Sequence, residues 1–271
     1  MSQQPSRQSF LGADSDRIFA SCKIGTVGIS GGGSHIVQQT AHVGFLNHVV
    51  IDPKKMEEKH LHRLVGGTAD DVKNETAKVR IAERIIKGIR PEANVQTFES
   101  TWQDAQLSLR DCTAIVGCLD TYSEREQLER FCRRFLIPVV DIGMDVLQFN
   151  GSYRIVGQVV MSSPGHPCLR CMGILTEEKL KLEAAEYGAA GPRAQVIWSN
   201  GVLASTAVGF LVQLLTPWFT PSSAGAYIEY NGNTPRLAPS PRIEHAINHP
   251  CPHFSTADVG DPFFRLDEVI K

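Results

Sequence analysis

The stretch from Lys23 to Asp52 constrains the fold more than any other part of this sequence. A short apolar, β-branched run at 23–29 is typical of a buried strand, and a second such run at 48–51 ends at Asp52. Between the two runs stand a glycine-rich turn and a segment with apolar residues near helical spacing. Strand, glycine turn, helix, strand and acid, in this order, predict a nucleotide-binding βαβ unit.

The glycine turn has a direct physical use. A helix N-terminus offers unpaired N–H groups and a partial positive charge, and glycine lets those groups approach a phosphate closely. Asp52 lies 19 positions after Gly33, near the roughly 20 residues expected of an acid that binds ribose hydroxyls. A tight strand–helix turn without a ligand is the alternative. The glycines expected to bind the nucleotide are Gly28, Gly31, Gly32 and Gly33.

Composition excludes several classes of protein. The 271 residues are 42% hydrophobic and 21% charged, which is ordinary for a soluble globular chain. A net charge of −2 favours neither nucleic acid nor an anionic membrane as a partner. We expect no apolar run of transmembrane length and no signal peptide at 1–10, hence a cytoplasmic protein without a membrane partner. Seven cysteines, an odd number, favour thiols or metal ligands over disulfides.

Apolar strands alternate with amphipathic helices beyond Asp52. The expected fold is α/β: a doubly wound, mostly parallel Rossmann-like sheet with a small antiparallel C-terminal extension. We expect strands at 94–98, 114–117, 138–142, 153–160, 226–230 and 234–238, and helices at 76–88, 122–135 and 197–215. One domain over 1–271 would comprise an N-terminal arm at 1–22, a nucleotide-binding core at 23–160, and at 161–271 a C-x-x-C motif, a crossing segment and the extension.

Three charged residues decide which nucleotide fits. The opening unit alone could hold a dinucleotide for hydride transfer or ATP for phosphoryl or adenylyl chemistry. Arg63 follows the second strand, Lys78 opens the next helix, and Asp120 follows the strand at 114–117. Strand C-termini line the ligand crevice of an open α/β sheet, so these groups could converge on phosphates, with Asp120 holding Mg²⁺. A dehydrogenase needs no such set, and solvated surface charges are the alternative for each residue alone.

At this point the chain resembles the ThiF/MoeB/HesA family of ubiquitin-activating-enzyme-like adenylyltransferases, from about Arg7 to about Phe254. The family's G-x-G-G-x-G turn is matched at 28–33, with Ser30 in place of one glycine, and its acid by Asp52. Its N-L-x-R-type motif is matched at 60–63, with His60 in place of the usual asparagine. The helix-opening lysine, the C-x-D motif and the N-terminal Arg-Gln pair correspond to Lys78, to Cys118-Leu119-Asp120 and to Arg7-Gln8.

The resemblance implies an enzyme that binds ATP and Mg²⁺ and adenylates a carboxylate, typically the C-terminal glycine of a ubiquitin-like or sulfur-carrier protein. It implies an acyl adenylate and pyrophosphate as products, and a homodimer in which Arg7 reaches the partner's nucleotide. Arg63, Lys78 and Asp120 would be catalytic, and His60 would help to hold the nucleotide. The alternatives are adenylation of a small-molecule, peptide or tRNA-linked carboxylate, and a non-catalytic nucleotide-binding scaffold.

The cysteines predict a metal site and argue against an enzyme thioester on this chain. Cys168 and Cys171 have the spacing of metal ligands, and the family pairs such a motif with a second C-x-x-C near the C-terminus to bind zinc. Here Cys251 is present, but Phe254 stands at the fourth ligand position, so His253 or His249 would complete the site. A metal-free pair of thiols is the alternative. Because no cysteine lies between Met172 and Pro250, we expect no thioester in the crossing segment.

Overall fold

A computed structural model describes residues 7–185, 194–219, 226–249, 251–254 and 260. The strands are β1 (Lys23–Val27), β2 (Asn47–Ile51), β3 (Asn94–Phe98), β4 (Ala114–Gly117), β5 (Val139–Phe149), β6 (Ser152–Ser162), β7 (Ala226–Asn231) and β8 (Arg236–Pro239). The α-helices are α1 (Ser15–Ser21), α2 (Gly31–Val43), α3 (Ala69–Lys73), α4 (Lys78–Ile89), α5 (Gln106–Leu109), α6 (Tyr122–Arg134), α7 (Glu177–Ala185), α8 (Ile197–Leu215) and α9 (Arg242–Ile247). Two 3₁₀ turns, η1 (Ser9–Leu11) and η2 (Glu58–His60), complete the described elements.

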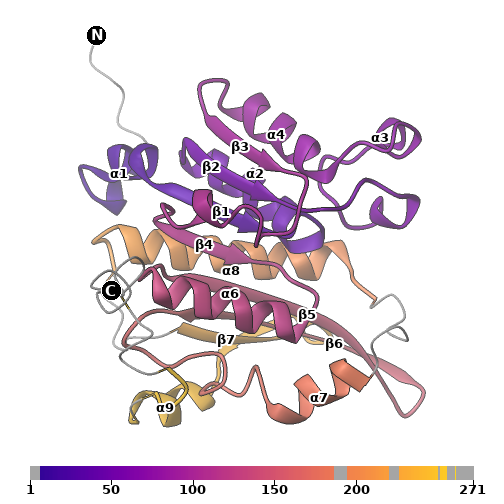
Figure 1. Cartoon of the computed structure of the whole chain (residues 1–271), viewed down its shortest axis with the longest axis vertical. Helices are drawn as coiled ribbons and strands as arrows, with labels where there is room; N and C mark the ends of the chain where they lie inside the picture. The colour runs from indigo at the N-terminus through magenta and orange to yellow at the C-terminus, as the bar shows by residue number, and fades with distance from the viewer. Residues whose placement is uncertain (1–6, 186–193, 220–225, 250, 255–259, 261–271) are drawn as a thin grey trace, which may run out of the picture.

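The described strands form one eight-stranded sheet in the order β3-β2-β1-β4-β5-β6-β7-β8 (Figure 1). Neighbours from β3 to β5 are parallel. Neighbours from β5 to β8 are antiparallel. The predicted fold class is therefore confirmed, since a doubly wound parallel half continues into an antiparallel C-terminal half.

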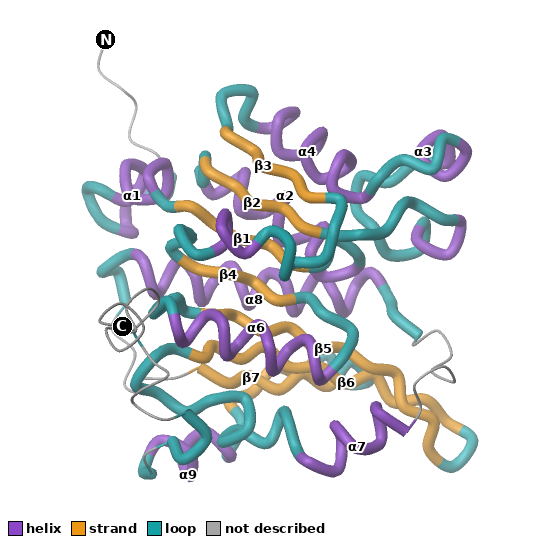
Figure 2. Tube along the Cα trace, viewed as in Figure 1, coloured by secondary structure: helices purple, strands orange, loops and turns teal. Residues whose placement is uncertain are grey.

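Helices cover both faces of the sheet. Figure 2 shows α6 on the near face of the strands and α8 behind them, and α8 packs against α2, β5 and β6. Side chains alternate along the strands, so that Ile115 of β4 packs with the α6 side while Val116 packs with the α8 side. The result is a three-layer core with the sheet in the middle.

The register of the parallel strands positions the site. Val27 at the end of β1 is paired with Ile51 of β2 and with Gly117 of β4. The three strands therefore end level with one another, and the residues that follow them meet at one edge of the sheet. This edge lies between β1 and β4, where the order of the strands reverses, which is where open α/β sheets bind their ligands.

Two element boundaries differ from the prediction for local reasons. Helix α2 begins at Gly31, so its first turn includes the glycines that the sequence assigned to a loop before the helix. Strands β5 and β6 are longer than expected because Asn150 and Gly151, both at positive φ, form a tight turn between them.

Helix α8 corrects the expectation that no apolar segment reaches transmembrane length. By length and hydropathy, this 19-residue helix would qualify as a membrane span. Its buried face, which includes Leu203, Ala207 and Leu211, packs into the core beside α2 and the sheet. The core helix of a three-layer protein needs the same composition, so α8 is accounted for by packing.

Candidate functional site

A cavity of about 560 Å³ lies at the carboxyl ends of β1, β2 and β4. Its lining includes five of the charged or polar residues that the sequence singled out, together with Gly28. Those five come from the connection between β2 and β3 and from the connection between β4 and β5, and they are Asp52, His60, Arg63, Lys78 and Asp120. The fold therefore brings together the set predicted for a nucleotide.

The turn after β1 has room for glycine alone at two positions. Gly28 has φ +90°, and a Cβ there would lie 2.5 Å from the carbonyl oxygen of Cys118. A Cβ on Gly33 would lie 1.9 Å from the carbonyl oxygen of Gly28. Such contacts are far inside van der Waals distance, so these glycines let the turn close tightly onto the first turn of α2, where N–H groups lack helical partners.

Asp52 is almost fully buried and helps to build the turn. Its Oδ2 accepts a hydrogen bond from the Ile29 N–H at 2.7 Å, and its Oδ1 accepts one from the Lys54 N–H at 2.8 Å. Burial raises the pKa of Asp52, while the positive charge of Lys78 acts in the opposite direction. The carboxylate lines the cavity as predicted for a ribose contact, and it also fixes the backbone around the glycines.

Lys78 is the first residue of α4 and is 2% exposed. Burial lowers the pKa of its ammonium group, and the nearby Asp52 carboxylate partly offsets this effect. A buried lysine on a cavity wall is costly without an anionic partner. This arrangement is therefore suited to a phosphate.

His60 replaces an asparagine of the family and is also buried. Its Nδ1 accepts a hydrogen bond from the Glu57 N–H at 3.0 Å. Burial and the positive charges of Lys78 and Arg63 lower the pKa of His60 to about 4, so the ring is neutral near pH 7. With Nδ1 acting as acceptor, the proton resides on Nε2, which leaves an N–H donor comparable to that of an asparagine amide.

Ser30, the other departure from the family pattern, has a partner across the cavity. The Arg63 Nε donates to the Ser30 Oγ at 3.2 Å. The hydroxyl therefore orients the guanidinium beside the N-terminus of α2, where a phosphate would lie.

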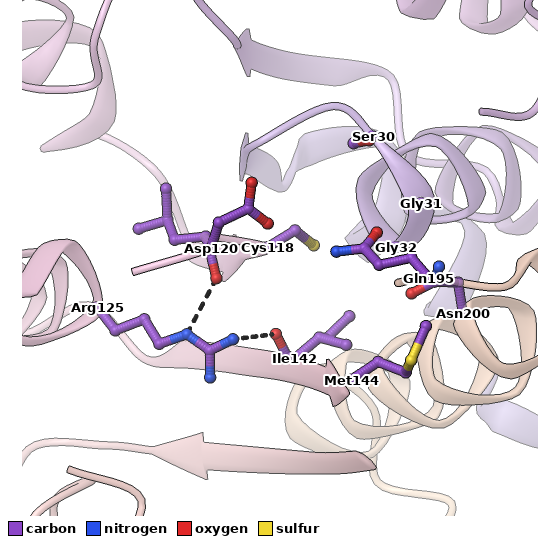
Figure 3. A pocket seen from close by; sticks show the side chains of 11 residues that line it. Ser30, Gly31, Gly32, Cys118, Asp120, Arg125, Ile142, Met144, Gln195 and Asn200 are labelled. Atoms are coloured by element: carbon purple, nitrogen blue, oxygen red, sulfur yellow. Dashed lines mark hydrogen bonds between the residues drawn. The ribbon is translucent and has the colours of Figure 1, made fainter. Parts of the chain in front are cut away.

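The loop that carries Asp120 is held by Arg125 of α6 (Figure 3). Its guanidinium donates to the Leu119 carbonyl at 3.0 Å, to the Asp141 carboxylate at 3.1 Å and to the Ile142 carbonyl at 3.3 Å. Asp120 itself is exposed on the cavity lining, where a carboxylate can bind Mg²⁺ together with phosphate oxygens. The sequence did not single out Arg125, because an arginine on an amphipathic helix usually faces solvent.

Arg7 does not line this cavity. It is exposed and precedes η1 and α1, which lead into the amino end of β1, opposite the carboxyl ends that form the site. Any contact of Arg7 with a nucleotide would have to be made across an interface. The role of Arg7 stays a prediction.

Cys118 faces the cavity but is a poor nucleophile. Burial, followed by the negative charge of Asp141, raises the pKa of its thiol well above the usual range. The thiolate form is the reactive one, so this environment disfavours Cys118 as a nucleophile. That no thioester forms on this chain stays a prediction.

Four predicted metal ligands lie together at the opposite end of α6. The ligand atoms of Cys168, Cys171, Cys251 and His253 all lie within 4.8 Å of one another. The sulfur atoms of Cys168 and Cys171 are 3.5 Å apart, and His253 Nδ1 lies 3.4 Å from Cys168 Sγ and 3.3 Å from Cys171 Sγ. Tetrahedral zinc with bonds of about 2.0–2.3 Å places its ligands at roughly such separations, so this set fits zinc. His249 instead contacts His245.

Phe254 does not belong to the ligand set and packs on a cation. Its ring lies over the Arg133 guanidinium at 4.8 Å. Arg133 in turn donates to the carbonyls of His166 and Pro167, and Glu129 accepts the Leu169 N–H at 2.9 Å. This buried pair on α6 shapes the loop that carries Cys168, and the sequence analysis did not identify it.

Two further polar residues near the site were also missed. Gln195 lines the cavity, and Asn200 lies on the buried face of α8 beside the glycine turn. The available signal was an asparagine in a mostly apolar helix. A polar residue at such a position calls for a partner.

The relatives found among curated proteins include an activating enzyme and an adenylyltransferase. The chain is 27% identical over 164 residues to the SAMP-activating enzyme E1 of Haloferax volcanii. The aligned segment covers 60% of this chain and 57% of the relative. It is 23% identical over 175 residues to the molybdopterin-synthase adenylyltransferase of Haemophilus influenzae. That aligned segment covers 63% of this chain and 68% of the relative. The chain thus matches only part of the length of each.

Solved structures show the same fold. E. coli MccB with succinimide superposes with a TM-score of 0.73 at 16% identity, covering 93% of this chain and 74% of that chain. MccB with ATP superposes with a TM-score of 0.69 at 16% identity, covering 87% of this chain and 67% of that chain. The model of the ThiF family matches residues 3–253. The family expected from the sequence motifs is confirmed, and the chain belongs to the ThiF family.

Proposed function

We propose that this protein is an ATP-dependent adenylyltransferase that activates the C-terminal carboxylate of a small ubiquitin-like or sulfur-carrier protein. The observation that carries the proposal is the convergence of Asp52, His60, Arg63, Lys78 and Asp120 on one cavity beside the N-terminus of α2. The names of the two relatives, an E1-type activating enzyme and an adenylyltransferase, support the same class of reaction.

The reaction follows from the charges around the cavity. The phosphates of ATP would lie at the N-terminus of α2, with the ribose near Asp52 and His60. A carboxylate oxygen of the substrate forms a bond to the α-phosphorus, and the bond from that phosphorus to the bridging oxygen breaks, which releases pyrophosphate. Arg63 and Lys78 neutralise the negative charge that grows on the leaving group. Magnesium held by Asp120 and the phosphates would supply further charge neutralisation.

The proposal also includes a zinc site, a homodimer and a cytoplasmic location. We propose that Cys168, Cys171, Cys251 and His253 hold a structural zinc ion. A homodimer is supported by an exposed aromatic group near Arg7, in which Phe10 packs edge-on against Trp218 at 5.9 Å although 67% of Phe10 is exposed. Reduced thiols and ATP both fit a cytoplasmic location.

The test is ATP–pyrophosphate exchange that depends on a carboxylate substrate. We expect wild-type protein to bind ATP in preference to NAD by calorimetry, and to exchange label in the presence of a carrier protein ending in Gly-Gly. Asp120→Ala should reduce exchange at least about a hundredfold while the protein stays folded. Asp111→Ala is the matched control, since that carboxylate is 65% exposed and lies outside the cavity lining.

The outcomes separate the alternatives. Exchange with a peptide, a small acid or an aminoacyl-tRNA and not with a carrier protein would identify another carboxylate. ATP binding without exchange for any carboxylate would support a nucleotide-binding scaffold. Binding of NAD without ATP would contradict adenylation altogether.

A further inference from the structure

Asn200 has a polar group for which the described part of the chain provides no partner. It lies in the first turn of α8 and is 3% exposed. Its backbone N–H donates to the Val196 carbonyl at 3.2 Å, but no hydrogen bond is found within the described residues for the buried Nδ2. A buried amide without a partner is costly, so the position calls for a ligand atom.

The amide lies against the glycine turn (Figure 3). A Cβ on Gly31 would lie 2.2 Å from the Asn200 Nδ2, so glycine at this position makes room for the carboxamide. Gly31 and Gly32 belong to the first turn of the 13-residue helix α2, where backbone N–H groups have no helical partners. Two side-chain N–H donors and the backbone donors of α2 therefore lie around one point.

That point is a small cavity between two larger ones. The small cavity, about 30 Å³, shares Ser30 and Asp120 with the ATP cavity described above. It shares Arg125 and Met144 with a wide cleft of about 1260 Å³ along β5 to β8. A substrate polypeptide that lies in the wide cleft and reaches the ATP cavity with its C-terminus would pass Asn200.

The charges of the small cavity favour a carbonyl over a phosphate. Arg63 and Lys78 line the ATP cavity and are absent from the lining of the small one. Among the residues that the structure describes, the one cation on the small lining is Arg125, whose guanidinium already binds Asp141 and two carbonyl oxygens. The remaining lining includes apolar side chains such as Ile142. An acyl group with a single polar oxygen matches this environment.

We propose that Asn200 is a substrate-binding residue whose carboxamide N–H groups donate to the acyl oxygen of the carboxyl group that is joined to AMP. This inference rests on the proposed adenylation. During the reaction one carboxylate oxygen bonds to phosphorus, and the other stays bound to Asn200. The residue thereby orients the attacking oxygen toward the α-phosphorus, and it continues to hold the carbonyl of the acyl adenylate.

The test compares a probe that contains the acyl group with one that lacks it. The first probe is acetyl-Gly-Gly joined to adenosine through a 5′-sulfamate, which resembles an acyl adenylate, and the second is AMP. We expect Asn200→Ala to weaken binding of the sulfamate at least about tenfold, while the AMP affinity changes less than about twofold. Asn200→Asp, with the same shape but acceptors in place of donors, should bind the sulfamate more weakly than Asn200→Ala. Asn94→Ala, an exposed amide on β3, is the control.

Thermal melting distinguishes binding from a structural role. Because the Asn200 Nδ2 has no partner among the described residues, Asn200→Ala should melt no lower than wild type without ligand, and the sulfamate should stabilise it less. Equal losses for the sulfamate and AMP, or no loss for either, would overturn the role of Asn200. Wild-type protein that binds neither ATP nor AMP would instead refute the proposed adenylation.

Discussion

Ser30 and His60 show how single residues can differ from a family pattern while the site stays intact. Ser30 adds a hydroxyl that orients Arg63. His60 presents an N–H donor because its other ring nitrogen is occupied by the Glu57 backbone. The histidine, unlike an asparagine, can take up a proton, and this makes the site sensitive to acid.

The acid sensitivity of His60 can be measured. Its pKa is about 4 in the folded protein and near 6.5 when unfolded, so between these values the unfolded chain binds more protons. The free energy of unfolding should therefore fall as the pH is lowered from 6.5 to 4. His60→Asn should flatten this dependence, which urea denaturation at a series of pH values would record.

His62→Asn is the matched control for this series, because His62 is exposed two positions away. It should keep the wild-type pH dependence. If His60→Asn follows the same pH dependence as wild type, protonation of His60 is not linked to folding.

Which site residues could be predicted from the sequence depended on their place in the chain. Asp52, Lys78 and Asp120 directly follow or open regular elements, so their position relative to the sheet edge could be predicted from the pattern of strands. Gln195, just before α8, and Asn200, in its first turn, reach the same edge from later in the chain, and only the packing of α8 against α2 brings them there. Such contacts are set by tertiary structure, and an asparagine in a mostly apolar helix indicates only that a polar partner is needed, not which one.

At the scale of elements, α6 connects two sites. Its N-terminal part carries Arg125, which holds the Asp120 loop, and its C-terminal part carries the buried Glu129 and Arg133, which hold the cysteine loop. The ring of Phe254 covers Arg133, which explains in packing terms why an aromatic residue stands where the family has a fourth cysteine.

Removal of the metal should loosen the C-terminal half of the protein. We expect one zinc ion per chain in protein purified without added metal. Chelation should lower the melting temperature by roughly 4–8 °C, the shift that corresponds to a loss of about 2 kcal/mol in a chain of this size. Elemental analysis and calorimetry are the measurements.

Two variants make the zinc experiment specific. Cys171→Ser should lose the metal and melt like the chelated wild type. Cys22→Ala, which changes a thiol in the core far along the chain, should retain it. Wild-type protein without zinc, and with melting unaffected by chelators, would identify these residues as plain thiols.

The element boundaries show where sequence patterns lose precision. β3 and β4 were predicted to the residue: β4 is a short apolar run, and β3 lies between the turn-forming Pro91 and the polar Glu99 and Ser100. Helix α2 was predicted to start too late, because glycine is a poor helix former and its role at a tight N-terminus is decided by the neighbouring strand end.

At the scale of the whole molecule, the predicted sheet was correct because each strand has a distinct apolar run and parallel pairs need helical crossovers. Assembly was harder to predict, since an interface is encoded by exposed residues without periodicity. Trp218 and Phe219, exposed by 43% and 46%, and Phe10 form an aromatic surface that follows from the folded structure alone.

A mixing experiment tests whether a second copy completes the site. Arg7→Ala and Asp120→Ala proteins should each be inactive in pyrophosphate exchange. In a random mixture about half of the dimers combine both chains, and each of these has one intact site, so activity should return to about a quarter of the wild-type value. The physical reason is that a guanidinium from the partner would stabilise the charge on the leaving pyrophosphate.

Arg17→Ala provides the control for a lost surface charge, since 79% of that side chain is exposed on α1. It should retain full exchange activity. Full activity of Arg7→Ala alone, or no recovery on mixing with both proteins dimeric, would contradict a role in trans.

The order of the elements along the chain also separates the side chains of the two proposed binding steps. The side chains proposed to hold the phosphates and ribose of ATP all lie before α6, whereas Asn200, the side chain proposed to hold the acyl oxygen, comes after β6. Recombination at one point near residue 121 could therefore change the carboxylate substrate that the enzyme recognises and leave the ATP-binding side chains unchanged. Proteins with this topology could therefore act on different carboxylate substrates while they keep the same ATP-binding residues.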